Sequence, residues 1–239
     1  MKIEYTEFTH QGIRNENQDR LLCLTGDDNA LFAIIDGMGG MCCGAEAAQE
    51  VRNSLKMSYT DIQDSASRLD GLKNALHRAN NRLTESERST RGATCSALWL
   101  EKGRYYIAHT GDTRIYRINR DKTALLTEDQ NLAFTMYSIG RKTYREYLTG
   151  SGHNKLLSFV GMGKGIKLLG FEGETSPGDI FLLNSDGLNQ FLQLKEVEEL
   201  GHETMLQDEP YRFVVERISK VVIPNQSDDN VSWICLQVY

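Results

Sequence analysis

The amino-acid sequence predicts an α+β protein, a four-layer α-β-β-α sandwich with two central antiparallel β-sheets flanked by helix pairs. Two observations lead to this fold class. Strand-like segments lie on both sides of two pairs of helical patterns, and the chain ends in a strand. Strands and helices do not alternate one by one, which argues against a parallel, doubly wound sheet. We therefore expect antiparallel sheets inside and helices outside.

The first half of the chain changes from strand-like to helical spacing. Three segments alternate in polarity or are wholly apolar, as strands do: 3–9, 21–25 and 31–35. After a glycine-rich stretch at 37–44, apolar residues recur at helical spacing over 47–55 and again over 69–83. Only a polar stretch (59–67) separates these two helices, so we expect them to pack as an antiparallel pair.

The second half of the chain returns to strands before a second pair of helices. Four short segments separated by tight turns predict an antiparallel meander: 94–101, 104–110, 114–119 and 123–127. Residues 128–165 are irregular and rich in glycine, which is typical of a mobile insertion over a site. The remaining elements are a strand at 179–184, a short helix around Val197 and Leu200, a helix over 211–222 and a closing strand over 231–238.

Composition and charge narrow the possible functions. The chain has 239 residues and a net charge of −6, which argues against a nucleic-acid binder that needs a basic face. The longest apolar run, 30–35, is too short to span a bilayer, and the first ten residues lack the apolar core of a signal peptide. Five cysteines in no metal-finger spacing are expected to be reduced thiols. We therefore expect a cytoplasmic protein without nucleic-acid or membrane partners.

Four aspartates stand beside glycine or asparagine at the ends of predicted strands, and a fifth, Asp19, lies just before the predicted strand 21–25. They are Asp19, Asp36, Asp112, Asp186 and Asp229. Hard divalent cations prefer carboxylate oxygens, and one carboxylate can bridge two ions, so segments far apart in the sequence can share a metal centre. Each dipeptide alone is more simply an ordinary turn. Their combination, in order, with Arg14 and a glycine-rich loop favours a functional site.

These residues belong to a series of motifs that resembles a known family. The motifs are Arg14-x-x-Asn17-Gln18-Asp19, Asp36-Gly37-Met38-Gly39-Gly40, Gly111-Asp112-Thr113-Arg114, Gly178-Asp179, Ser185-Asp186-Gly187-Leu188 and Asp229-Asn230-Val231. Their order and spacing resemble those of the PPM family, the metal-dependent type 2C protein phosphatases, here of the compact bacterial kind. The resemblance runs from about residue 3 to residue 238. It implies one phosphatase domain over 1–239, with a variable flap at about 128–165.

The resemblance implies a dinuclear metal centre between the two sheets. Asp36 would bridge two Mn²⁺ or Mg²⁺ ions, and the Gly37 carbonyl would bind one of them. Asp186 and Asp229 would bind the other ion. Asp112 would, with Asp186, help to form a weaker third metal site. The two ions would lower the pKa of a shared water, whose hydroxide attacks phosphorus in line without a phosphoenzyme.

The same resemblance assigns the remaining roles and reveals two departures from the family. Asp19 would hold metal-bound water, and Arg14 would bind the substrate phosphate with its planar guanidinium. Gln18 stands where some relatives carry an acid. Met38, which has no proton to donate, stands where eukaryotic relatives place a proposed general acid. His109 is the nearest candidate to replace that acid, but a structural role is the simpler interpretation.

Two further groups are ambiguous in the sequence. Only one of Asp228 and Asp229 should face the metals, because side chains alternate along a strand, and the Asp-Asn pair favours Asp229. Arg141, Lys142 and Arg145 form a basic cluster in the expected flap. Such a cluster is usually a solvated face. Contact with an acidic or phosphorylated partner is the alternative.

The function implied by the resemblance is that of a Mn/Mg-dependent protein serine/threonine phosphatase. Its partners would be phosphorylated proteins, substrates of a cognate serine/threonine kinase, and we expect a monomer. Two alternatives remain open: an inactive relative that serves as a binding or scaffold module, and a phosphatase of a small phosphorylated metabolite. The retained carboxylates weigh against the first alternative, and no feature of the sequence excludes the second.

Overall fold

Two five-stranded antiparallel sheets stack face to face in the computed structural model, which describes residues 1–38, 43–85, 91–101, 103–222 and 226–239. The first sheet has the order β2 (Arg20–Thr25), β3 (Asn29–Met38), β4 (Gly92–Glu101), β5 (Arg104–Thr110) and β8 (Leu169–Glu174). The second has the order β1 (Ile3–His10), β10 (Val231–Val238), β9 (Ile180–Asn184), β6 (Arg114–Ile118) and β7 (Thr123–Leu125). All paired strands are antiparallel, as expected.

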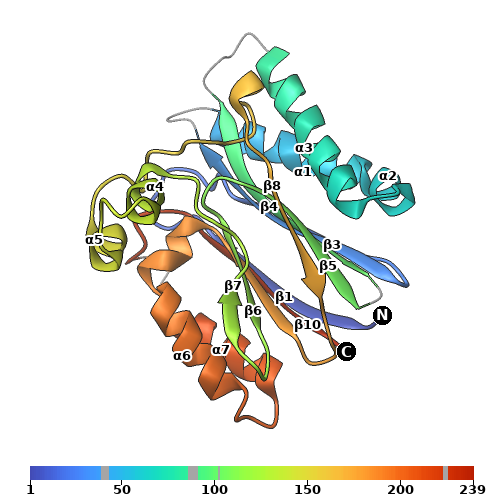
Figure 1. Ribbon diagram of the computed structural model, residues 1–239, viewed down its shortest axis with the longest axis vertical. Helices are drawn as coiled ribbons and strands as arrows, with labels where there is room; N and C mark the ends of the chain where they lie inside the picture. Colours follow the sequence, from blue (N-terminus) through green and yellow to red (C-terminus); the bar gives the residue numbers. More distant parts are fainter. Residues whose placement is uncertain (39–42, 86–90, 102, 223–225) are drawn as a thin grey trace.

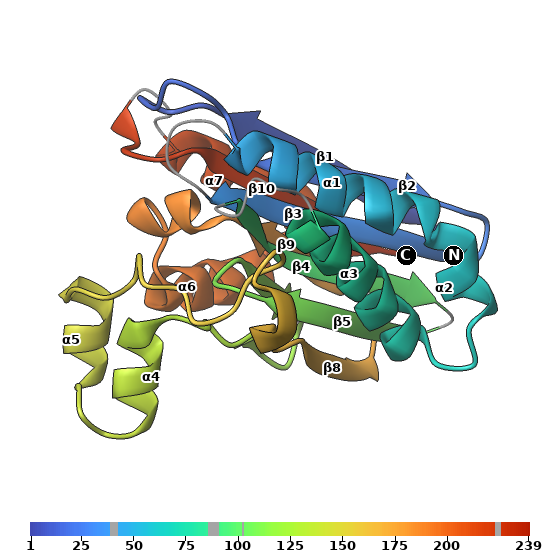
Figure 2. The same ribbon diagram turned by 90° about the horizontal axis from the view of Figure 1, so that it is seen from above.

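Helices cover the outer face of each sheet (Figures 1 and 2). The first sheet is covered by α1 (Gly44–Met57), α2 (Tyr59–Asp64) and α3 (Arg68–Glu85), and the second by α6 (Leu194–Thr204) and α7 (Pro210–Val221). The expected four-layer α-β-β-α sandwich is therefore confirmed. Two short helices, α4 (Leu132–Ser138) and α5 (Tyr144–Thr149), project at one end of the sandwich (Figure 1). Single 3₁₀ turns occur at η1 (Gly163–Gly165) and η2 (Asp186–Gln190).

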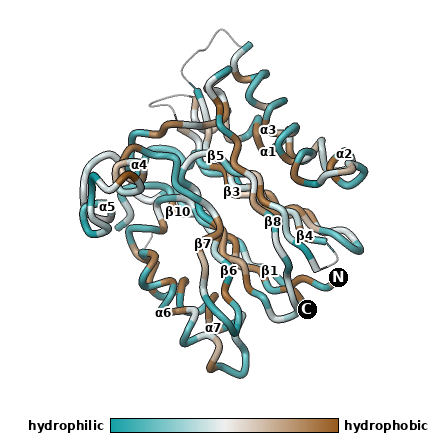
Figure 3. Tube along the Cα trace, in the orientation of Figure 1, coloured by the Kyte–Doolittle hydropathy of each residue, from teal (hydrophilic) through white to brown (hydrophobic). Residues whose placement is uncertain are grey.

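The four layers enclose three hydrophobic cores, and strand alternation decides which residue enters which core. In β3, Leu31 and Ile35 pack toward α1 and α3, whereas Phe32 and Ile34 pack between the sheets. The third core lies between β10 and the helices α6 and α7, where Trp233 is buried. Because β3 is covered on both faces, its apolar run is continuous rather than alternating. Figure 3 shows hydrophobic stretches along these inner strands.

The structure corrects the predicted meander. The strands β4 and β5 pair in the first sheet, but β6 and β7 belong to the second, so the chain crosses between sheets at Gly111-Asp112-Thr113. The sequence of a tight turn is the same for a hairpin and for such a crossover. Only the packing of β6 against β9 distinguishes the two. The crossover therefore places Asp112 between the sheets rather than in an exposed hairpin.

Four further elements depart from the sequence-based expectation. The polar stretch 59–67 contains the short helix α2, which buries Ile62. The irregular segment 128–165 contains α4 and α5, each begun by a side-chain cap, Asn131 and Thr143. The edge strand β8 was not predicted; its weak alternation includes two glycines that leave little apolar signal.

Candidate metal centre

The predicted aspartates gather at the end of the sandwich that lies opposite the chain termini. The register of β1 and β10 places Ile3 beside Val238 at one end and His10 beside Val231 at the other. Asp229 precedes β10 at this second end. Alternation along β3 turns Asp36 to the same side as Phe32 and Ile34, the space between the sheets. The site is thus the polar end of the core between the two sheets.

A layer of neutral polar side chains separates the hydrophobic core from the aspartates. The hydroxyl of Ser96 lies 2.9 Å from His109 Nδ1 and 2.8 Å from Thr113 Oγ1, and His109 Nε2 lies 2.8 Å from the Glu128 carbonyl oxygen. All of these side chains except that of Glu128 are fully buried. Burial lowers the pKa of His109 to about 4, so its ring is neutral near pH 7. This environment favours the structural role expected for His109.

Asp19 is almost completely buried, with 3% of its surface exposed. The Ser185 hydroxyl donates to its Oδ2 at 2.8 Å. Burial raises the pKa of Asp19 to about 7, and the negative charges of Asp186 and Asp229 add to this, although hydrogen bonds from Ser232 and Ser185 oppose it. The hydrogen bonds therefore orient the Asp19 carboxylate, but they do not offset the cost of burying its negative charge.

The other carboxylates raise one another's pKa in the same way. Burial raises the pKa of Asp36 well above its ordinary value, and so do the charges of four neighbours: Asp19, Asp186, Asp112 and Asp229. The pKa of Asp112 is raised well above its ordinary value, first by burial and then by the charge of Asp186. Burial, followed by the charge of Asp229, raises the pKa of Asp186 to about 6. All five predicted aspartates therefore interact within one site.

Arg14 reaches this site from the loop that follows β1. Its Nη2 donates to Asp229 Oδ2 at 2.9 Å, while more than half of its side chain stays exposed. Gly12 makes the approach possible: its φ is +64°, and a Cβ there would lie 2.2 Å from the Asp229 carbonyl oxygen. The Asn230 amide then holds the loop by donating to the carbonyls of Gln11 and Glu16 at 2.7 and 3.0 Å.

Glycines allow close backbone contact on the other side of the site. A Cβ on Gly37 would lie 2.2 Å from the Gly44 carbonyl oxygen, and one on Gly44 would lie 2.7 Å from the Gly37 carbonyl oxygen. The start of α1 therefore packs directly against the predicted Gly37 ligand. Likewise, a Cβ on Gly187 would lie 2.0 Å from the Asn230 carbonyl oxygen. These contacts bring Asp36, Asp186 and Asp229 together from three segments of the chain.

The chemistry of the site fits hard divalent cations. Oδ1 of Asp19 and Oδ1 of Asp186 are buried without a hydrogen-bond partner among the described residues. Buried carboxylate oxygens are costly unless a proton, a hydrogen-bond donor or a cation compensates them. In the described part of the chain, no group of three or more acidic, histidine or cysteine side chains is arranged so that together they could hold a metal ion. Mg²⁺-type sites need only one or two carboxylates per ion, with water as the remaining ligands.

The structure thus brings together every predicted site residue, while three parts of the motifs deserve separate mention. Asp228 is exposed and Asp229, the residue predicted to face the metals, is half-buried. Asp36 lies within β3 rather than at its end, because the strand continues to Met38. Gly39 and Gly40 of the motif, like Cys42, lie outside the described residues.

Sequence reasoning assigned no role to several polar residues that shape the site. Ser185 and Ser232 orient Asp19, and Asn230 anchors the Arg14 loop. Ser185 and Asn230 lie within the motifs and Ser232 directly follows the last one, but their partners come from distant segments. Only their position near the aspartates could have indicated a role in the site, because serine and asparagine are common in turns.

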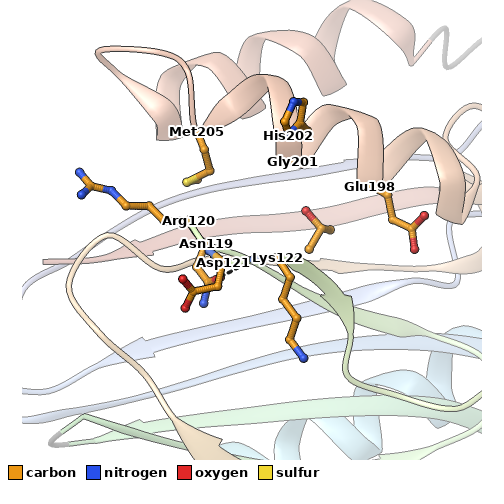
Figure 4. Close-up of a pocket in the computed structure, with 9 residues that line it drawn as sticks. Asn119, Arg120, Asp121, Lys122, Glu198, Gly201, His202 and Met205 are labelled. Carbon is orange, nitrogen blue, oxygen red and sulfur yellow. Dashed lines mark hydrogen bonds between the residues drawn. The ribbon is translucent and has the colours of Figure 1, made fainter.

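A separate pocket of about 240 Å³ lies between the turn joining β6 to β7 and the helix α6 (Figure 4). Its lining mixes both signs of charge, with Arg120 and Lys122 on the one hand and Asp121 and Glu198 on the other. The turn lies at the far end of β6 from Asp112, so this pocket is not part of the candidate metal centre.

The chain is similar in sequence and fold to known protein phosphatases. A family model described as Protein phosphatase 2C matches residues 9–222. The chain is 26% identical over 207 residues to the serine/threonine phosphatase stp of Listeria welshimeri, a match that covers 82% of this chain and 82% of the relative.

Two solved structures extend the comparison. The serine/threonine phosphatase Stp1 from Staphylococcus aureus has a TM-score of 0.84 at 25% identity, covering 100% of this chain and 96% of that one. The catalytic domain of the serine/threonine protein phosphatase PstP, in complex with 2 manganese ions, has a TM-score of 0.81 at 22% identity, covering 98% and 97%. The second likeness concerns the fold.

Proposed function

Because the chain belongs to the protein phosphatase 2C family, we propose that it hydrolyses phosphoserine and phosphothreonine in proteins with two divalent ions, Mn²⁺ or Mg²⁺. The family match confirms the family that the motifs resemble, and the relatives named serine/threonine phosphatase support the class of enzyme. The observation that carries the proposal is the convergence of five aspartates, two of them with buried oxygens that have no hydrogen-bond partner among the residues the structure describes.

Four side chains and one carbonyl would hold the ions. Asp36 would bridge them, with the Gly37 carbonyl on one ion and Asp186 and Asp229 on the other, while Asp112 would contribute to a weaker third site. When bound, two divalent cations supply hydroxide near neutral pH and offset negative charge on a phosphoryl group. The mutually raised pKa values of these carboxylates support this assignment. Crowded, buried negative charges favour a bound proton, and for the same reason they favour a bound metal cation.

Two residues act on water and phosphate. The hydrogen bonds from Ser185 and Ser232 hold the Asp19 carboxylate so that it accepts a hydrogen bond from the attacking water. Arg14 is exposed at the rim of the site, so its guanidinium can exchange Asp229 for two phosphoryl oxygens without crossing the core. Met38 has no proton to give, so protonation of the leaving group would fall to water in the site or to another residue.

Hydrolysis assays test the proposal directly. A small aryl phosphate, a phosphoserine peptide and a phosphothreonine peptide are incubated with Mn²⁺, with Mg²⁺ and with a chelator. We expect hydrolysis of the phosphopeptides that stops in chelator. Activity that persists in chelator contradicts the metal mechanism, and no activity with any divalent ion favours a scaffold. Selective hydrolysis of small metabolites over both peptides favours the metabolite phosphatase.

The cellular setting is part of the proposal. We propose a cytoplasmic monomer that reverses the action of a cognate serine/threonine kinase, with residues 128–165 as a flap that influences substrate choice. In the described part of the chain, no helix is long and apolar enough to cross a membrane, and Cys23, Cys95 and Cys235 are free thiols. A phosphoproteome comparison of a deletion strain with its parent tests the substrates, and light scattering tests the monomer.

A further inference from the structure

A second buried charge cluster lies beside the candidate metal centre and has no part in the proposed reaction. Arg114 on β6 donates through Nε to Asp129 Oδ1 at 2.9 Å and through Nη2 to Asp129 Oδ2 at 2.7 Å. The two side chains are only 6% and 3% exposed. Such a bidentate pair is a rigid connection, because its planar geometry fixes both partners.

Tyr147 adds the flap helix α5 to this pair. Its hydroxyl accepts a hydrogen bond from Arg114 Nη2 and donates one to Asp129 Oδ2, both at 2.7 Å. Its ring stacks on Tyr137 of α4, with centroids 5.5 Å apart, and packs against His153 at 5.2 Å. One side chain therefore ties both flap helices to the buried ion pair.

The next residue in the chain connects the same pair to the site. Gln130 follows Asp129, and its backbone N–H donates to the Gly111 carbonyl at 2.7 Å. Its side-chain Oε1 accepts from the Gly111 N–H at 2.9 Å and from Thr110 Oγ1 at 3.1 Å. Gln130 thus binds both the N–H and the carbonyl group of Gly111, in the crossover turn that carries Asp112.

The crossover turn has little room to move independently of Gln130. Gly111 has φ +103°, and a Cβ there would lie 2.3 Å from Thr94 Cβ on the neighbouring strand. Because the turn packs against Thr94 and is hydrogen-bonded to Gln130, we expect a shift of the segment 129–130 to displace Asp112. Hydrogen bonds and the peptide link between Asp129 and Gln130 thus connect α5 to Gly111, the residue before Asp112.

We propose that Tyr147 is a positioning residue that couples the flap helix α5, through Asp129 and Gln130, to the turn that carries Asp112. The inference rests on the proposed function, because its consequence for catalysis concerns the metal site that Asp112 would help to form. A partner that displaces α5 would, by the same path, change the affinity of that site for its ion. Tyr147 itself touches neither substrate nor metal.

The test is Tyr147→Phe in the full chain, which removes the hydroxyl and keeps the ring. In hydrogen exchange without metal, we expect the amides of 111–116 and 144–149 to exchange about tenfold faster, the effect of losing buried hydrogen bonds of ordinary strength. In phosphopeptide hydrolysis, we expect the Mn²⁺ concentration for half-maximal rate to rise about tenfold, the lower range for residues that orient metal ligands. Turnover at saturating Mn²⁺ should stay within about twofold of the parent chain, since no group that binds substrate changes.

The matched control is Tyr144→Phe, the same change on the same helix at a residue that is 37% exposed. It should leave both exchange and the Mn²⁺ requirement unchanged. A merely structural role for Tyr147 would speed exchange throughout the chain and leave the Mn²⁺ requirement unmoved, and that result would overturn the coupling. So would parental exchange at 111–116. A parent chain without phosphatase activity overturns the proposed function, whereas the exchange data alone still decide whether α5 and the turn are coupled.

Discussion

The candidate metal centre and the neighbouring Arg114–Asp129 cluster both contain a buried aspartate, but the pKa values of these aspartates shift in opposite directions. Asp112 and Asp129 are 7% and 4% exposed, so burial penalises their charges alike. Burial and the charge of Asp186 raise the pKa of Asp112 well above its ordinary value. Burial would also raise the pKa of Asp129, but the charge and hydrogen bonds of Arg114 outweigh it and the pKa is lowered.

The difference shows that the partner, and not the burial, decides what a buried carboxylate does. Asp129 receives its compensation from the protein, through Arg114 and Tyr147, and so serves the scaffold. The aspartates of the metal centre are compensated less: the charge of Arg114 lowers the pKa of Asp112 and Asp186, but burial and the neighbouring carboxylates outweigh it. Arg14, which pairs with Asp229 of these aspartates, lies at the exposed rim. The remaining compensation must come from solution, which suits a site that binds metal ions and a phosphate.

Breaking the compensated cluster should produce the largest effect. We expect Asp129→Ala to lower the free energy of unfolding by about 3–5 kcal/mol, because it leaves the Arg114 charge buried and unpaired. Urea denaturation in excess chelator measures this change. Glu50→Ala is the matched control, since it removes an ion pair with Arg82 at the surface and should cost at most about 1 kcal/mol. A loss for Asp129→Ala no larger than that of the control would contradict the comparison.

Removing a charge from the uncompensated cluster should have the opposite sign for stability. We expect Asp36→Asn to reduce phosphopeptide turnover by about a hundredfold or more, because the metal bridge supplies several kcal/mol of transition-state stabilisation. Without metal, its free energy of unfolding should equal or exceed that of the parent chain, since repulsion within the site falls. Turnover and urea denaturation are measured on one preparation. Asp228→Asn, at the exposed neighbour of Asp229, should change neither quantity, and near-parental turnover in folded Asp36→Asn would sink the bridging role.

Metal ions should supply the compensation that the chain lacks. At a free Mn²⁺ concentration of about 100 times the dissociation constant, we expect the free energy of unfolding to rise by about 2.7 kcal/mol. Thermal or urea denaturation with Mn²⁺ and with chelator measures the difference. The gain should persist in Glu50→Ala and shrink in Asp36→Asn. An equal gain in both variants would place the stabilising ion elsewhere.

The pH dependence of stability should separate the clusters by the smallest effect. The folded pKa values of Asp19 and Asp186 are about 7 and about 6, against an ordinary 3.8. Their stabilising contribution is therefore complete below about pH 4 and is lost as pH rises through 6 and 7. Asp129, whose folded pKa is lowered, contributes fully above pH 4 and loses its contribution only in stronger acid.

Asp19→Asn isolates this effect in chelator-treated protein. The buried His109 titrates with the opposite sign below about pH 6.5, but it does so equally in parent and variant. From pH 5 to pH 7 we expect the variant to gain on the order of 2 kcal/mol relative to the parent chain. Urea denaturation across this range tests the sign, and a gap that stays constant or closes would refute the raised pKa of Asp19.

The sequence by itself determined the fold class and the composition of the site. The patterns that indicated the fold are local and are set by the periods of strand and helix. They are the alternation in Ile3–His10, the continuous apolar run before Asp36 and the helical spacing in α1 and α3. The aspartates were found because four of them stand beside a glycine or asparagine and all five follow one another in an ordered series of motifs. Their type and order can be read along the chain.

Only the tertiary structure decided how these residues compensate one another. The sequence around Asp112 and Asp129 does not indicate that Asp112 lies near other carboxylates whereas Asp129 binds Arg114 and Tyr147. The crossover at Gly111 was misread as a hairpin for the same reason, because the choice between two sheets depends on packing against β9. Charge compensation and sheet membership are contacts between segments far apart in sequence, and local periodicity carries no information about them.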